Sequence, residues 1–278
     1  MAPELAVKYR SSLALIRARG SAVVAFSGGV DSALVLRLAV EALGAERVLA
    51  VTGRSPSVPS ADLAGVAKLA AALGARHAFH DTSEFDDPNY VANPQNRCYF
   101  CKSDLYEGLR ALARERGLAV VLCGTNADDL GDYRPGLQAA DEHGVLAPLA
   151  EVGMTKAEVR ALSAALGVPV ADKPASPCLS SRVPYGEAVT VEKLRRIDAA
   201  ETLLRGLGFR DCRVRHHESL ARIEVPADEV ERFADAALRQ RVDAALRELG
   251  FQYVALDLRG LRSGSLNEVL LGPGLRGV

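Results

Sequence analysis

The sequence lacks any apolar stretch long enough to span a bilayer, and its N-terminus lacks the pattern of a signal peptide. An excess of one charge is also missing, since 34 Lys and Arg residues stand against 35 Asp and Glu residues, for a net charge of −1. A nearly neutral chain has no overall attraction to nucleic acid, which leaves only local basic patches to consider. We therefore predict a cytoplasmic protein with neither membrane nor nucleic-acid partners.

Cysteine is scarce, with five residues in 278. In a cytoplasmic chain, these few cysteines argue against structural disulfides and for metal binding or catalysis. Cys98 and Cys101 form a Cys-x-x-Cys pair, which could hold a soft metal or exchange a disulfide. Cys178 lies far from them in a proline-flanked loop with a nearby arginine, which favours a lowered thiol pKa. Cys123 and Cys212 fall in apolar strand patterns, so we predict that both are small core residues.

The common nucleotide-binding pattern G-x-x-x-x-G-K-[ST] is absent, and no lysine lies near the glycine-rich turn. That turn is Ser27-Gly28-Gly29-Val30-Asp31-Ser32, between an apolar run that predicts a strand and one that predicts a helix. A helix N-terminus attracts anions, the glycines let the backbone approach a phosphate, and the serines add hydroxyl donors. The Asp31 carboxylate would repel a phosphate unless a metal accompanies it. The turn therefore predicts a phosphate loop that also uses a cation, and an incidental Gly-Gly turn is the alternative.

Strand and helix patterns alternate through about residue 170. The predicted strands lie at 22–26, 47–52, 76–80 and 118–123, and the predicted helices lie near 33–40, 60–74 and 103–116, with a later one opened by the capping box Thr155-x-x-Glu158. This alternation predicts an α/β fold with a doubly wound parallel sheet and ligands at the carboxyl ends of its strands. Thr52 and Arg54 would then flank the adenosine of a nucleotide, unless they belong to a plain polar turn.

The pattern changes after Gly186. A helix near 190–206, strands at 211–216 and 221–225, a helix near 227–248 and a strand near 251–258 predict a smaller C-terminal α+β domain. We therefore place a domain boundary near residue 187. The sequence contains neither an internal repeat nor a low-complexity segment.

Two further groups of charged residues are candidates for ligand binding. Asp128, Asp129 and Asp132 follow the strand at 118–123, where a cation would be needed before a triphosphate could approach them. The alternative is that these three carboxylates are ordinary loop charges in contact with solvent. Arg213 and Arg215 alternate along a strand and so share one face, where they could bind a phosphate or simply face solvent.

Six motifs follow one another along the chain: Ser27–Ser32, Asn96–Lys102, Gly124–Gly136, Cys178–Gly186, Arg213–His216 and Ala221–Glu224. Taken in this order, they resemble the LarE sulfur transferases of the PP-loop ATP pyrophosphatase superfamily. The resemblance therefore covers most of the chain. It implies a PP-loop domain (adenine nucleotide alpha hydrolase-like) over residues 1–187 and a domain over 188–278 that binds substrate or forms an oligomer.

The resemblance also implies a reaction. LarE proteins use ATP to adenylate the carboxylates of pyridinium-3,5-biscarboxylic acid mononucleotide, release pyrophosphate and form thiocarboxylates for the nickel-pincer cofactor of lactate racemase. Mg²⁺ and ATP would bind at the phosphate loop with Gly124 and Asp128, Asp31 would act in catalysis, and Arg213 and Arg215 would hold the substrate's phosphate. A homo-oligomer such as a hexamer is expected.

The resemblance implies that Cys178 occupies the sulfur-transfer position of this family. Some members have only that cysteine and sacrifice its sulfur, which leaves dehydroalanine. Others hold a [4Fe-4S] cluster on three cysteines, with an extra sulfide on the open fourth iron. Cys98, Cys101 and Cys178 match the three-cysteine form, and a zinc clip or a fortuitous pair is the alternative for the first two.

Three other functions share parts of this pattern. A tRNA thiolation enzyme also combines a PP-loop with three cysteines in some cases, although the neutral net charge counts against it. An amide-forming synthetase such as NAD or GMP synthetase has no need of three thiols. A non-catalytic nucleotide-binding module would release no pyrophosphate.

Overall fold

The computed structural model describes residues 2–131, 135–174, 176–262 and 266. The chain folds into two compact units, Met1–Ser176 and Pro177–Val278. The predicted domain boundary near 187 therefore falls inside the second unit, and Cys178 lies at the start of that unit. The roles assigned to residues 1–187 and 188–278 stay predictions. Among the described helices, none is both long enough and apolar enough to cross a membrane.

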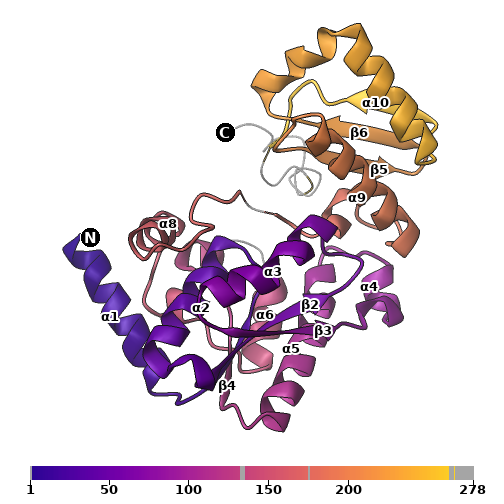
Figure 1. Ribbon diagram of the computed structural model, residues 1–278. Coiled ribbons are helices and arrows are strands. Elements are labelled where there is room, and N and C mark those ends of the chain that lie inside the picture. Colours follow the sequence, from indigo (N-terminus) through magenta and orange to yellow (C-terminus); the bar gives the residue numbers. More distant parts are fainter. Residues whose placement is uncertain (1, 132–134, 175, 263–265, 267–278) are drawn as a thin grey trace. The chain divides into compact units, whose positions relative to one another are not determined.

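The first unit is built on a four-stranded parallel sheet in the order β3-β2-β1-β4. The strands are β1 (Ala22–Ala25), β2 (Val48–Arg54), β3 (Arg76–Asp81) and β4 (Val120–Leu122). The helices are α1 (Pro3–Arg17), α2 (Val30–Leu43), α3 (Ser60–Ala72), α4 (Pro88–Val91), α5 (Arg97–Glu115), α6 (Pro135–Glu142), α7 (Pro148–Glu151) and α8 (Lys156–Ala165). Helices flank both faces of the sheet (Figure 1). The predicted doubly wound parallel sheet is confirmed.

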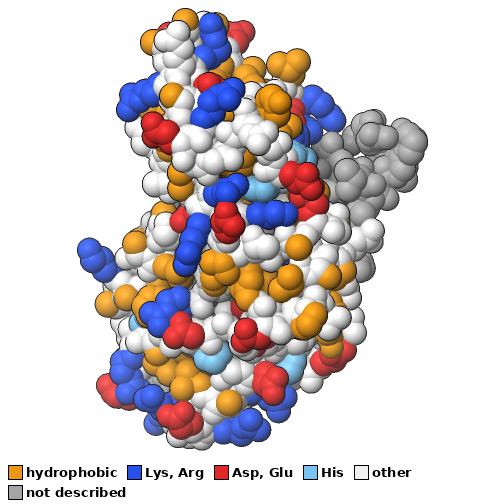
Figure 2. Space-filling model, turned by 90° about the vertical axis from the view of Figure 1, so that its right-hand side faces the viewer, with side chains coloured by type: hydrophobic (Ala, Val, Ile, Leu, Met, Phe, Trp, Pro, Cys, Tyr) orange, Lys and Arg blue, Asp and Glu red, His pale blue; other side chains and the backbone are white. Residues whose placement is uncertain are grey.

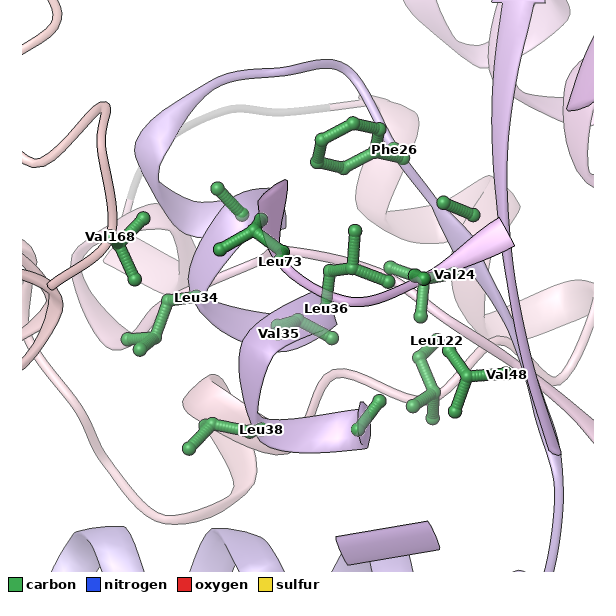
Figure 3. Packing of buried hydrophobic residues seen from close by; sticks show 14 of the residues in the cluster. Val24, Phe26, Leu34, Val35, Leu36, Leu38, Val48, Leu73, Leu122 and Val168 are labelled. Carbon is green, nitrogen blue, oxygen red and sulfur yellow. The ribbon is translucent and has the colours of Figure 1, made fainter. Parts of the chain in front are cut away.

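Strand β1 reads as a continuous apolar run because it is covered on both faces. Val24 belongs to the cluster that α2 forms with the sheet, where Figure 3 shows it beside Leu36. The neighbouring Val23 points to the opposite face and packs in a second cluster with Leu109 of α5. Alternate side chains of one strand thus anchor helices on two sides, which fixes the position of the segment that follows the strand.

The order of the strands also says where a ligand should bind. The chain winds outward from β1 through β2 to β3, then crosses back to place β4 on the other side of β1. In such sheets the ligand crevice lies at the carboxyl ends of the strands, at this point of reversal. The loop Ser27–Ser32 leaves β1 at that edge, and Gly124 follows β4 there.

The second unit contains a three-stranded sheet in the order β5-β6-β7 with an antiparallel and a parallel pairing. Its main elements are α9 (Val191–Gly206), β5 (Arg213–His217), β6 (Leu220–Glu224), α10 (Ala236–Glu248) and β7 (Tyr253–Leu256). The predicted α+β composition is confirmed. The single helix predicted near 227–248 is wrong, because a 3₁₀ helix (Ala227–Ala234) ends before Asp235, whose extended backbone and side chain cap the start of α10.

The surface carries both signs of charge. Figure 2 shows Lys and Arg side chains interspersed with Asp and Glu side chains on the visible face. This mixture agrees with the near-zero net charge of the sequence.

Candidate active site

The loop Ser27–Ser32 is held in shape by its own serines. The Ser32 hydroxyl donates to the Gly29 carbonyl at 3.0 Å and accepts from the Ser27 N–H at 3.3 Å, and the two serine oxygens lie 3.2 Å apart. Gly28 has a φ of +72°, a conformation that favours glycine, and a Cβ there would lie 2.9 Å from Val66 Cγ1. The first glycine is therefore required both by the backbone and by the space available.

The start of α2 lies against the segment that follows β4. Gly29 is the N-cap residue of α2 and has no side chain with which to cap the first N–H groups of the helix. A Cβ on Gly124 would lie 2.7 Å from the Ser32 nitrogen and 3.1 Å from Asp31 Cβ, so only glycine permits this approach. The structure thus brings the predicted residues Gly124, Asp31 and Ser32 together and leaves the helix N-terminus open toward an anion.

Asp31 is held by two residues that sequence reasoning did not connect with the loop. Lys156, the first residue of α8, donates from Nζ to Asp31 Oδ2, and Asn126 Nδ2 donates to Asp31 Oδ1 at 3.1 Å. The absence of a lysine near the turn in sequence is therefore compensated by a lysine 125 positions away. The available signal was the capping box at Thr155, because it marks a helix start just before Lys156.

A second distant lysine lies against the phosphate loop. Lys173 Nζ donates to the Gly28 carbonyl at 3.3 Å and to Asp62 Oδ1 of α3 at 2.9 Å. Asp62 Oδ2 accepts from the Ser176 hydroxyl at 2.6 Å. Two ammonium groups, those of Lys156 and Lys173, thus reach the loop from distant positions in the sequence.

Thr52 and Arg54 have partners within the sheet. The buried Thr52 hydroxyl donates to the Phe26 carbonyl at 2.6 Å and lies 2.8 Å from His77 Nε2, whose pKa is lowered by burial. Arg54 forms a two-pronged, exposed ion pair with Asp81, which raises the pKa of Arg54 and lowers that of Asp81. Thr52 therefore lies beside Phe26, the residue that precedes the phosphate loop, and the adenosine contacts of Thr52 and Arg54 stay predictions.

The acidic run after β4 forms a tight, self-capped turn. Asp129 Oδ2 accepts from the Asn126 N–H at 3.0 Å, and Asn126 Oδ1 accepts from the Asp128 N–H at 3.0 Å. Asp128 Oδ2 accepts from the N–H of Lys156 at 2.9 Å. This turn therefore places Lys156 and Asn126 against Asp31. The candidate Asp132 lies outside the described residues.

Cys98 and Cys101 lie at the start of α5, which begins at Arg97 rather than near the predicted residue 103. Residues three positions apart lie on the same side of a helix, so both thiols share one face. Cys98 is exposed and Cys101 is partly exposed. Arg97 is buried and donates to the Asn93 side chain, which anchors the start of the helix.

The predictions for the two core cysteines are confirmed. Cys123 is 4% exposed and lies 3.3 Å from the Thr125 hydroxyl, and Cys212 is fully buried. Burial raises the pKa of the Cys212 thiol to about 12, which makes it a poor metal ligand at neutral pH. Among the described residues, no three Cys, His, Asp or Glu side chains already lie together as a metal site.

The partly exposed Cys178 belongs to the second unit, where it precedes a short 3₁₀ helix (Leu179–Arg182). Arg182 is buried and turns back over this loop, with Nη1 donating to the carbonyls of Pro177 at 2.9 Å and Cys178 at 3.1 Å. Its Nε and Nη2 donate to the buried Glu201 of α9 at 2.8 and 3.1 Å. The loop is therefore tied to α9 through one guanidinium group.

The two predicted phosphate-binding arginines differ in their surroundings. Arg215 is buried, holds Glu224 through Nε and Nη2 at 3.0 and 2.9 Å, and donates to the Ser181 carbonyl at 2.6 Å. Arg213 is half-buried, and burial followed by the charge of Arg182 lowers its pKa. The structure thus brings Arg213, Arg215 and the Cys178 loop together within one unit.

Comparisons with known proteins agree with this arrangement. The sequence profile of the NAD synthase family matches residues 10–127, which include the phosphate loop. The chain is 50% identical to an uncharacterized protein of Synechocystis over 90% of this chain and 92% of that relative. It is 39% identical to the pyridinium-3,5-bisthiocarboxylic acid mononucleotide synthase of Lactiplantibacillus plantarum over 96% of both chains.

The match to the synthase is long enough to include every predicted site residue of both units. It spans 266 residues, so it extends beyond the nucleotide-binding half that the NAD synthase profile recognises. The chain therefore belongs to the LarE family of pyridinium-3,5-bisthiocarboxylic acid mononucleotide synthases, within the PP-loop ATP pyrophosphatases.

Proposed function

We propose that the protein is an ATP-dependent sulfur transferase. It converts the carboxylates of pyridinium-3,5-biscarboxylic acid mononucleotide into thiocarboxylates and releases AMP and pyrophosphate. The observation that carries this proposal is the 39% identity to the L. plantarum synthase over 96% of both chains. The open start of α2 behind a glycine-rich loop supports the use of ATP.

The residues around the loop suit a triphosphate that is cleaved between its α and β phosphates. The N–H groups at the start of α2 and the ammonium groups of Lys156 and Lys173 would bind the pyrophosphate leaving group. The negative charge that develops on that leaving group is stabilised by positive groups already in position. The α-phosphate would then be left to react with a substrate carboxylate.

Asp31 fits a role as a magnesium ligand. Mg²⁺ usually takes one or two carboxylates together with phosphate oxygens, and Asp31 is the carboxylate of the phosphate loop. Its side chain is 23% exposed and already holds the ammonium group of Lys156, so this position accepts a cation. When bound, Mg²⁺ would neutralise phosphate charge, and Lys156 would then be released toward the phosphates.

Cys98, Cys101 and Cys178 fit the ligand set of a [4Fe-4S] cluster. All three thiols are at least partly exposed, whereas Cys123 and Cys212 are buried. Three thiolates leave the fourth iron open, and that iron would supply a site for a sulfide to be delivered. Arg213 would hold the phosphate of the substrate, because its half-buried guanidinium group lies on β5 next to Arg215, which contacts the Cys178 loop.

The proposal is tested by analysis of the products. The anaerobically prepared protein is given Mg²⁺, ATP, sulfide and pyridinium-3,5-biscarboxylic acid mononucleotide. We expect AMP, pyrophosphate and a thiocarboxylate product, each detected by liquid chromatography and mass spectrometry. ADP and phosphate, or release of pyrophosphate without a sulfur-containing product, would contradict the proposal.

The variant Asp31→Asn makes this test specific to the loop. It keeps the shape of the side chain and removes its charge, so we expect pyrophosphate release to fall about 100-fold, as for the loss of one preorganised charged group. Glu41→Gln, at the opposite end of the same helix, serves as the matched control and should keep activity.

Two further properties belong to this proposal. We propose that the protein works in the cytoplasm and assembles into a homo-oligomer such as a hexamer, with the small-molecule nucleotide as its partner. Light scattering of the purified protein measures the oligomer, and a monomeric mass would contradict it.

A further inference from the structure

The backbone on both sides of Cys178 is fixed by a single atom. Nη1 of Arg182 donates to the Pro177 carbonyl at 2.9 Å and to the Cys178 carbonyl at 3.1 Å. These carbonyls belong to the peptide groups immediately before and after the Cys178 Cα atom. When both peptide planes are held, φ and ψ of Cys178 are held as well, here at −58° and 149°. These two angles fix the direction of the Cα–Cβ bond and therefore the point from which the thiol extends.

The guanidinium group is itself immobilised. Its Nε and Nη2 donate to the two oxygens of Glu201, and the two side chains are only 1% and 0% exposed. Glu201 also accepts from the Val214 N–H at 3.1 Å and from Arg205 Nη2 at 2.9 Å. The carboxylate is therefore held by α9 and β5 at once, and Arg182 carries that rigidity to the Cys178 loop.

Stability alone is a weak explanation for this pair. A buried ion pair usually adds little compared with apolar side chains of the same volume, because both charges lose their hydration. It does impose a fixed geometry, since a guanidinium group and a carboxylate bind as two parallel forks. Such a support is what a reacting side chain needs, because a misplaced thiol reacts slowly.

We propose that Arg182 and Glu201 are positioning residues that aim the Cys178 thiol for sulfur transfer. This inference rests on the proposed function, in which the Cys178 thiol is one of the three that would hold the cluster from which sulfide is delivered. Neither residue touches the substrate in this role. Each acts through the backbone of residues 177 and 178.

The test compares Arg182→Lys and Glu201→Gln with a matched control. Lysine keeps the charge of Arg182 but cannot hold Glu201 and two carbonyls together, and glutamine keeps the shape of Glu201 without its charge. Arg239 is the control, because its Nη1 also donates to two consecutive carbonyls, those of Phe233 at 2.7 Å and Ala234 at 2.6 Å. Arg239→Lys therefore removes the same kind of support elsewhere in the unit.

The first readout separates the two halves of the reaction. We expect Arg182→Lys and Glu201→Gln to keep pyrophosphate release within about twofold of the natural protein. Thiocarboxylate formation should fall about 10- to 100-fold, which is the cost of a reacting group displaced by about 1 Å. Arg182→Gln should be slower still, and Arg239→Lys should change neither half. An equal loss of both halves would indicate general damage and overturn the proposal.

The second readout does not depend on the proposed function. Alkylation by iodoacetamide is followed for each cysteine by mass spectrometry of the peptides. We expect Cys178 to react at least about threefold faster with iodoacetamide in the two variants, because a loop that is no longer held opens more often to the reagent, while Cys98 and the Arg239→Lys protein keep their rates. If the natural protein makes no thiocarboxylate, the proposed function fails. The alkylation rate of Cys178 then tests by itself whether Arg182 and Glu201 hold the Cys178 loop. An unchanged Cys178 rate in the folded Glu201→Gln protein overturns the proposal even if Arg182→Lys does not fold.

Discussion

Gly124 shows how strictly one residue can be constrained at the candidate site. A methyl group at this position would lie 2.7 Å from the Ser32 nitrogen and 3.0 Å from the Asp31 carbonyl carbon, both of them backbone atoms of α2. The helix start would have to move away from the end of β4, and with it the N–H groups that would bind phosphate. The requirement for glycine is therefore one of space, since no positive φ applies to this residue.

Gly124→Ala is accordingly expected to weaken both ATP binding and the fold. We expect the Kd for ATP, measured by isothermal titration calorimetry, to rise at least about tenfold, and the free energy of unfolding to fall by about 1–3 kcal/mol. Gly131→Ala is the matched control, because a Cβ there meets no atom within 4 Å among the described residues. An ATP affinity equal to that of the control would contradict the close approach seen here.

His216 is a buried base whose neutral form the fold requires. It is 2% exposed, its ring lies 5.3 Å from that of Phe251, and neither ring nitrogen has a hydrogen-bond partner among the described residues. Burial lowers the pKa of His216 to about 4, with smaller contributions from the charges of Lys193 and Arg196. The unfolded chain, with an ordinary pKa near 6.5, binds the proton more readily.

This difference predicts a loss of stability in acid. Above about pH 6.5 neither state is protonated at His216, and stability does not depend on it. As the pH falls from about 6.5 to 4, the unfolded state gains the proton first, so the free energy of unfolding should decrease by about 3 kcal/mol. Urea unfolding at a series of pH values measures how steeply the free energy of unfolding changes with pH. His216→Leu should remove this contribution, and an unaltered slope in that variant would refute the assignment.

At the scale of elements, the start of α5 matters most for the proposed cluster. The sequence predicts a helix only from about residue 103, because Cys-Tyr-Phe-Cys has no strong helix formers. The structure extends α5 to Arg97, whose buried side chain is held by Asn93, and this contact could not be read from local propensity. The extension places Cys98 and Cys101 one helical turn apart, on the same face.

Single replacements of the three thiols should therefore act alike. After anaerobic reconstitution, we expect Cys98→Ala, Cys101→Ala and Cys178→Ala each to lose most of the iron and acid-labile sulfide, because a cubane needs every thiolate. Cys123→Ala and Cys212→Ala, at buried positions, should keep both. Chemical analysis of iron and sulfide measures this. Zinc bound in place of iron would instead support a zinc clip.

At the scale of the whole molecule, the sequence predicts the local features well and the distant contacts poorly. The parallel sheet, the phosphate loop and the buried Cys123 and Cys212 all follow from local patterns. The ion pair between Lys156 and Asp31 joins residues 125 positions apart, and the contact of Lys173 with Gly28 joins residues 145 apart. The spacing of residues along the sequence does not predict such pairs, because they depend on which segments the fold brings together at one edge of the sheet.

Two routes of sulfur delivery are open to the proposed reaction, and the fate of the protein itself distinguishes them. A sacrificed Cys178 yields at most one sulfur for each chain, because its conversion to dehydroalanine consumes the protein. A cluster held by Cys98, Cys101 and Cys178 would instead take sulfide from solution, and the protein would not be consumed. With sulfide supplied, we therefore expect more thiocarboxylate than protein, together with an unchanged protein mass by intact mass spectrometry. Loss of one H₂S from the Cys178 peptide, in step with product, would favour sacrifice even if iron were bound. Cys98→Ala sharpens the comparison, since it should stop repeated turnover while leaving Cys178 available for a single sacrificial one.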